Sequence, residues 1–116
     1  MQIAMTLQDR ITQAEKLPKS GELGTMGQVR RIRQALVGFT AGQMQQWTIV
    51  AVGDTFVTGN PTTRVMVTLD DDMIRAWAGL IDHWSRMGEV GIDESELYES
   101  VKEAADSLPD QPTEEE

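Results

Sequence analysis

The residues of this chain that could do chemistry are few, and they form no recognisable catalytic set. The sequence holds one histidine, His83, and no cysteine, so thiol catalysis, disulfides and cysteine metal sites are excluded. One histidine and five dispersed serines offer no nucleophile at a recognisable spacing from an activating base. We therefore expect no catalytic residue, no metal ligand and no cofactor, and we interpret the protein as non-enzymatic.

Three consecutive aspartates, Asp70, Asp71 and Asp72, are the clearest candidates for metal ligands. Successive residues of a helix point about 100° apart, so three in a row do not converge on one ion. A helix N-terminus stabilises negative charge. The triplet therefore indicates the start of a helix rather than a metal site.

The main basic cluster is Arg30, Arg31 and Arg33, followed by Gln34. Guanidinium groups bind phosphates and carboxylates, so we expect this helix face to contact nucleic acid or an acidic partner. The alternative is a solvated face that pairs with the chain's own carboxylates.

Two nucleic-acid-binding folds share parts of this pattern. Gly24-Thr25-Met26-Gly27, between two expected helices and before the arginines, is similar to the GxxG loop of KH domains, which implies RNA binding. In a winged-helix arrangement, Thr40 to Trp47 would be the recognition helix and Gly59-Asn60 the tip of the wing. A nucleic-acid-binding regulator is therefore one alternative function.

Charge divides the chain into two unlike halves. Six basic and three acidic side chains lie between Met1 and Val50, whereas four basic and sixteen acidic ones lie between Ala51 and Glu116. The total is −9, which opposes approach to a polyanion. A second alternative is therefore an acidic inhibitor that mimics nucleic acid through its C-terminal half.

Five positions carry the signal of a helix start, a small oxygen-bearing residue followed three positions later by an acid or amide. They are Thr6, Thr25, Thr40, Thr68 and Asp93. Together with the apolar spacing that follows them, they predict two N-terminal helices and two C-terminal helices. Whether 41–47 is helical stays open.

The middle of the chain reads as β-structure. Runs rich in β-branched residues at about 47–52, 55–58 and 62–68 are separated by glycine-containing turns. They predict a three-stranded antiparallel meander. The fold class is therefore α+β, with one globular domain at 1–108 and a short disordered acidic tail at 109–116.

The first strand of this meander is apolar on both faces, although edge strands are usually blunted by charge, proline or a bulge. A helix or the same strand of a second copy must cover it. Trp77 and Trp84 share one helical stripe, which is either core or a partner surface. We therefore predict a homodimer or partner interface made by Ile49, Val50, Val52, Trp77 and Trp84.

The preferred function is a non-enzymatic interaction or assembly protein, homodimeric and cytoplasmic, with no membrane association. The N-terminal residues meet polar side chains too early for a signal peptide or a membrane span. Small accessory proteins of viruses and mobile elements often have this profile, but no motif here identifies such a source or names the partner.

Overall fold

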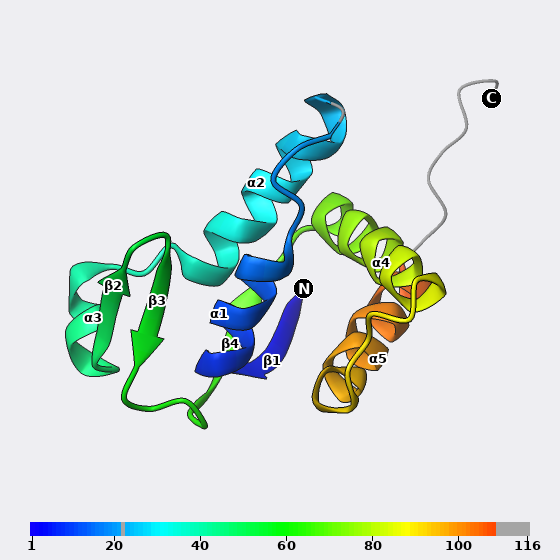
Figure 1. The fold of residues 1–116 in the computed structure, drawn as a ribbon. Helices are drawn as coiled ribbons and strands as arrows, with labels where there is room; N and C mark the ends of the chain where they lie inside the picture. The colour runs from blue at the N-terminus through cyan, green and yellow to red at the C-terminus, as the bar shows by residue number, and fades with distance from the viewer. Residues whose placement is uncertain (22, 109–116) are drawn as a thin grey trace, which may run out of the picture.

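The computed structural model describes residues 1–21 and 23–108 and has an α+β fold, as the sequence predicts (Figure 1). The predicted acidic tail at 109–116 lies outside the described residues. The elements, in chain order, are β1 (Gln2–Thr6), α1 (Leu7–Lys16), α2 (Leu23–Val37), α3 (Ala41–Gln46), β2 (Ile49–Val52), β3 (Thr55–Thr58), β4 (Arg64–Thr68), α4 (Asp71–Arg86) and α5 (Ile92–Ser107).

The predicted meander is wrong in its pairing, although its three strands exist. β2 pairs with β3 in one antiparallel sheet, and β4 pairs with β1 in another. β1 is a strand that we did not predict. Its alternating pattern buries Ile3 and Met5 while Gln2 and Ala4 face outward.

The segment between β3 and β4 explains why the meander is interrupted. The first backbone amides of a helix have no partner within the helix. Here the N–H of Leu7 donates to the carbonyl of Thr63 at 2.9 Å, and that of Gln8 donates to Pro61 at 3.1 Å. This loop is therefore held at the start of α1, and β4 runs on beside β1 instead of returning along β3.

The main core lies between the β1–β4 sheet and the helices α2, α4 and α5. Trp77 is completely buried and Trp84 is 6% exposed, both within this core. Tyr98 of α5 packs on Trp84, with ring centroids 5.8 Å apart. The apolar stripe of α4 is therefore used inside the chain.

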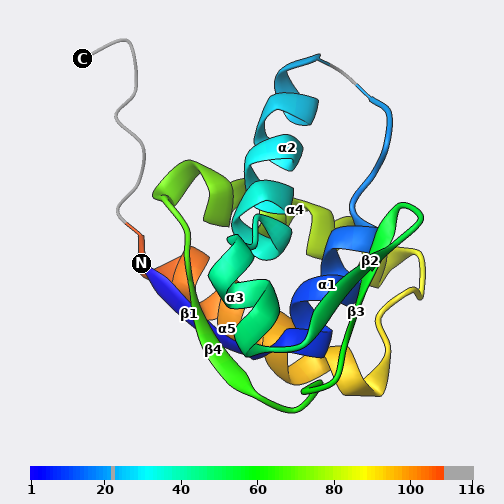
Figure 2. The same ribbon diagram turned by 90° about the vertical axis from the view of Figure 1, so that its left-hand side faces the viewer.

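The β2–β3 hairpin and α3 form a separate end of the molecule. In Figure 1 they lie at the left, while α4 and α5 lie at the right. Figure 2 shows α3 and β2 diverging from their junction at Trp47–Thr48. The edge of β2 beyond this junction therefore extends away from α3.

Candidate protein interaction surface

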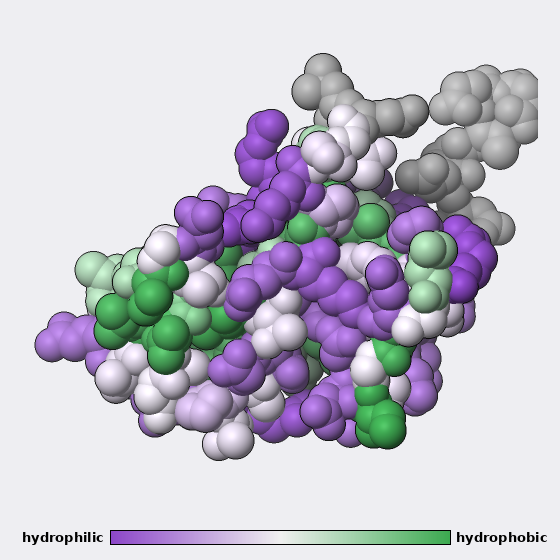
Figure 3. Space-filling model, in the orientation of Figure 1, coloured by the Kyte–Doolittle hydropathy of each residue, from purple (hydrophilic) through white to green (hydrophobic). Residues whose placement is uncertain are grey.

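The outer face of the β2–β3 hairpin is an exposed apolar surface. Val50, Val52 and Val57 are 57%, 52% and 55% exposed. Val50 and Val57 are direct cross-strand partners, and Val52 lies two residues further along the same face. We call these three residues the valine face. Apolar side chains gather at this end of the molecule in the space-filling view (Figure 3).

The inner face of the hairpin holds the valine face in place. Phe56 packs edge-on against Phe39 with ring centroids 5.5 Å apart, and Phe39 packs against Trp47 at 6.4 Å. The hydroxyl of Thr58 donates to the carbonyl of Trp47 at 2.7 Å. Aromatic contacts and hydrogen bonds therefore fix one side of the hairpin, and the other side faces outward.

A buried arginine supports this aromatic cluster. The Arg10 Nε donates to the carbonyl of Leu36 at 2.7 Å, and Nη2 donates to that of Ala35 at 3.2 Å, so the guanidinium caps the C-terminal end of α2. It also lies over the Phe39 ring, 4.7 Å from the centroid. Burial lowers the pKa of Arg10. Sequence analysis missed this role, because the pattern of α1 does not distinguish Arg10 from a solvated arginine.

The two turns at the ends of the hairpin fix which backbone groups are paired within it. Gly53 has φ +61°, as expected for the first central residue of a tight hairpin turn. At the other end, the N–H of Gly59 donates to the carbonyl of Thr48 at 3.0 Å. Backbone hydrogen bonds alternate along antiparallel strands. The N–H and carbonyl groups of Val50 and Val52 therefore bond to β3, while those of Ile49 and Ala51 point away from β3.

The β2 edge is open at Ala51. The residue is exposed, and no hydrogen bond joins its backbone to any part of the chain that the structure describes. β3 lies against α1, whereas β2 contacts α3 and then diverges from it (Figure 2). The hairpin therefore offers one free edge and one free face, a combination that natural proteins usually avoid on a surface without a partner.

The predicted basic surface is divided by the fold. Arg31 forms an ion pair with Asp70 at the start of α4, and Arg33 donates to the carbonyls of Ala14 and Asp54, each at 3.4 Å. Arg30 and Gln34 are exposed. The structure therefore does not bring these four residues together as one surface.

The predicted partner interface is partly corrected. Val50 and Val52 are exposed as that hypothesis needs, but Ile49 is 4% exposed and packs inward. Trp77 and Trp84 are core residues, because the α4 stripe is covered by α2 and α5. These three side chains are therefore not available to a partner.

The motifs that suggested nucleic-acid binding are also placed differently. Gly24 to Gly27 lie within α2 rather than in a loop, so they do not form a GxxG loop. The turn of the hairpin is Gly53-Asp54, so Gly59-Asn60 is not the tip of a wing. The expected recognition helix is the six-residue α3 and carries no basic side chain.

A polar network ties α1 to α5 near the main core. The Glu94 carboxylate accepts hydrogen bonds from Gln13 at 2.7 Å, from Lys16 at 3.0 Å and from the Tyr98 hydroxyl at 3.0 Å. Burial of Glu94 would raise its pKa, but these bonds and one from the Gly91 N–H outweigh burial and lower the pKa to about 2. Burial raises the pKa of Tyr98, and the Glu94 charge adds to this. Every member is partnered, so the network is structural.

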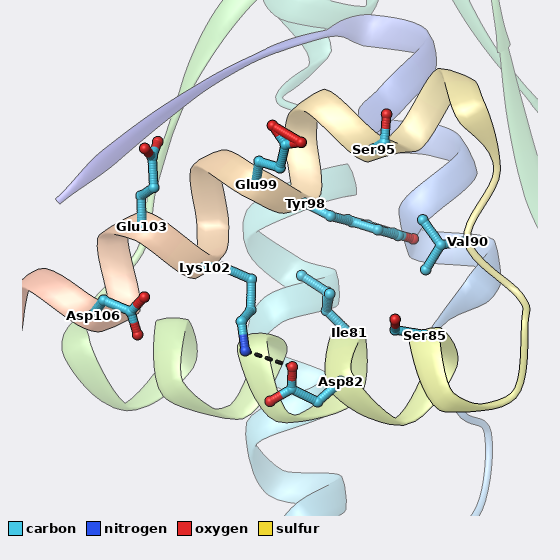
Figure 4. Close-up of a pocket in the computed structure, with 10 residues that line it drawn as sticks. All are labelled: Ile81, Asp82, Ser85, Val90, Ser95, Tyr98, Glu99, Lys102, Glu103 and Asp106. Carbon is cyan, nitrogen blue, oxygen red and sulfur yellow. Dashed lines mark hydrogen bonds and ion pairs between the residues drawn. The ribbon is translucent and has the colours of Figure 1, made fainter.

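A hollow of about 400 Å³ lies between α4 and α5 (Figure 4). Ile81, Val90 and Tyr98 form its apolar part, and Lys102 crosses it to pair with Asp82. Glu99, Glu103 and Asp106 complete an acidic rim. These residues include no nucleophile with a base, and His83 is not among them.

The aspartate triplet begins α4, as the sequence indicates, with Asp70 as the N-cap. Its carboxylate accepts from the Met73 N–H at 2.8 Å, and this bond, with the Arg31 charge, lowers the pKa of Asp70. Across residues 1–21 and 23–108, no cluster of three potential metal ligands is present.

Comparisons with protein-family models, with curated proteins and with solved structures gave no match. Within the described ranges, no helix has the length and apolarity that crossing a membrane requires. The geometry of the chain itself is therefore the basis for a functional proposal.

Proposed function

We propose that this protein is a non-enzymatic interaction or assembly protein that binds a protein partner through the valine face and the open β2 edge. The observation that carries the proposal is the exposure of Val50, Val52 and Val57, each more than half accessible on a strand pair with a free edge. Strand addition to such an edge is a common mode of protein recognition.

The charge pattern supports a protein partner rather than a nucleic acid. Between Gln34 and Thr63 the chain has a single charged residue, Asp54. Protein surfaces that bind nucleic acid are rich in lysine and arginine, because neutralising the phosphates provides most of the binding affinity. An uncharged apolar face suits another protein surface instead.

The proposal is tested with the matched variants Val50→Lys and Met66→Lys. Both residues lie in strands and are similarly exposed, at 57% and 54%, but Met66 is in β4, outside the hairpin. We expect wild type and Met66→Lys to retain the same protein in affinity capture from the source cell, and Val50→Lys to lose it. With that protein purified, the affinity of Val50→Lys should fall about tenfold or more, since a lysine would be desolvated in the contact.

Thermal unfolding of each variant must show that it folds like the wild type. Equal affinity of Val50→Lys and wild type for the purified partner would contradict the proposal. So would an equal loss in both variants, because the surface would then not be the hairpin.

A further inference from the structure

We infer that the hairpin's partner is a second copy of this chain, whose β2 pairs antiparallel with the first β2 about a two-fold axis at Ala51. The inference rests on the proposed function, because it names the occupant of the same surface. Four features of the molecule support it: the free backbone groups, the side-chain register, the charge distribution and the size of the patch.

The backbone of the β2 edge is self-complementary. The N–H and carbonyl of Ala51 point away from β3, and so do those of Ile49. When two copies meet antiparallel at Ala51, each Ala51 N–H faces the other copy's Ala51 carbonyl. The two hairpins then form one four-stranded sheet, which removes both open edges.

This register also joins the two valine faces. Val50 of one copy lies opposite Val52 of the other, in a pair without mutual hydrogen bonds, where side chains approach most closely. Each of these valines is already beside a β3 side chain of its own hairpin, Val57 or Thr55. The result is a continuous apolar strip across four strands.

The charge distribution favours this end of the molecule for self-association. Two copies that each carry −9 repel one another. The hairpin end has Asp54 as the one charged residue from Gln34 to Thr63, while α4 and α5 carry dense carboxylates at the opposite end (Figure 1). In the proposed register the two Asp54 residues are six strand positions apart, about 20 Å. Contact through the hairpins therefore keeps the acidic ends of both copies far apart.

The size of the patch sets the expected strength. Stable interfaces bury about 1,200 to 2,000 Å², and three half-exposed valines on each copy provide far less. The shared backbone hydrogen bonds must therefore add to the valine contact. We expect a weak, reversible dimer that forms at high micromolar concentration.

The absence of cysteine permits a direct test with single-cysteine variants. In the proposed register the two Cα atoms at position 51 lie about 5.5 Å apart, within disulfide range, so Ala51→Cys should form a covalent dimer under mild oxidation. Val57→Cys is the matched control, because positions 57 are separated by three strand spacings, about 14 Å. We expect Ala51→Cys to cross-link about tenfold faster or more, as followed on non-reducing gels.

A second variant removes the proposed hydrogen bond between the two copies and leaves the hairpin intact. Ala51→Pro deletes an N–H that the hairpin does not use, so the dimer should disappear in analytical ultracentrifugation while the hairpin's own NMR signals persist. Equal cross-linking rates at positions 51 and 57, or a wild-type chain that stays monomeric at high micromolar concentration, would overturn the dimer. If the dimer is overturned but wild type captures another protein that Val50→Lys does not capture, the proposed function stands with that protein as the partner. If Val50→Lys captures the same proteins as wild type, both proposals fail.

Discussion

The α4–α5 pair packs its apolar face into the main core, whereas the β2–β3 hairpin leaves one of its two apolar faces exposed. Ile74, Trp77 and Ile81 of α4 are 0% to 4% exposed within the main core. The outward surface of α5 carries exposed carboxylates, namely Asp93, Glu96, Glu99, Glu103 and Asp106. The aromatic inner face of the hairpin is half-buried, and its valines are in contact with solvent.

This difference separates stability from recognition. Apolar surface that is buried within the chain contributes to folding, at roughly 25 cal/mol per Å². Apolar surface left outside contributes little until a partner covers it. The acidic end of the molecule thus holds much of the core, and the hairpin end holds the valine face, which is still free to bind.

The largest test of this contrast compares Trp77→Ala with Val52→Ser. Trp77 is fully buried, so its truncation leaves a large cavity and should lower the free energy of unfolding by about 3 to 5 kcal/mol. Val52 is 52% exposed, and its substitution should change stability by no more than about 0.5 kcal/mol. Urea unfolding followed by far-UV circular dichroism measures both. A comparable loss in the two variants would show that the hairpin face is part of the folding core.

The helices illustrate which parts of the fold could be predicted from the sequence. Thr6 with Asp9 and Thr40 with Gln43 form the reciprocal caps that the sequence predicts, because both bonds of each cap are local. The predicted starts at Thr25, Thr68 and Asp93 are wrong. Longer-range contacts explain two of these errors. The first is Thr68, which pairs with Gln2 in the β1–β4 sheet, so the N-cap of α4 is Asp70 instead.

The second of these two, the predicted start at Asp93, is wrong because of the Glu94 network. The N-cap of α5 is Gly91, whose N–H donates to Glu94, three residues later. The same carboxylate is held by Gln13 and Lys16, which lie about 80 positions away in the sequence. No local pattern reports such a contact, so sequence reasoning placed the cap at Asp93.

Two residues of the valine face, Val50 and Val52, were predictable for the same reason as the local caps, whereas Val57 was not predicted. Val50 and Val52 were found because an apolar run with a two-residue turn is a local signal. The strand β1 and the burial of Trp77 and Trp84 depend on which segments meet across the chain. A tryptophan stripe in the sequence is the same whether a helix or a partner covers it.

The second test concerns the Glu94 network at the helical end. The folded-state pKa of Glu94 is about 2 against an ordinary value of 4.5, so its stabilisation is complete above about pH 4.5 and is lost as the pH falls towards 2. We expect Glu94→Gln to be on the order of 2 to 3 kcal/mol less stable than wild type at pH 7. The gap should close at low pH, as urea unfolding at a series of pH values would show.

The control for this series is Glu96→Gln, which removes an exposed carboxylate from the same helix. It should follow the wild-type curve closely. A gap between wild type and Glu94→Gln that is as large at pH 2 as at pH 7 would mean that the charge of Glu94 does not hold α5 to α1. The helical end would then differ from the hairpin end in its apolar packing, and the charge of Glu94 would add nothing to that difference.

The smallest expected effect belongs to Arg31, whose ion pair with Asp70 joins α2 to the start of α4. About half of each side chain is exposed, so Arg31→Ala should lower the free energy of unfolding by no more than about 1 kcal/mol. The same variant separates the two interpretations of the basic cluster. If the arginines pair with the chain's own groups, wild type and Arg31→Ala should both fail to bind duplex DNA or RNA in low-salt fluorescence anisotropy. Salt-sensitive binding by wild type that Arg31→Ala weakens would instead assign a nucleic-acid contact to α2, and the uncharged hairpin would no longer be the main surface for recognition.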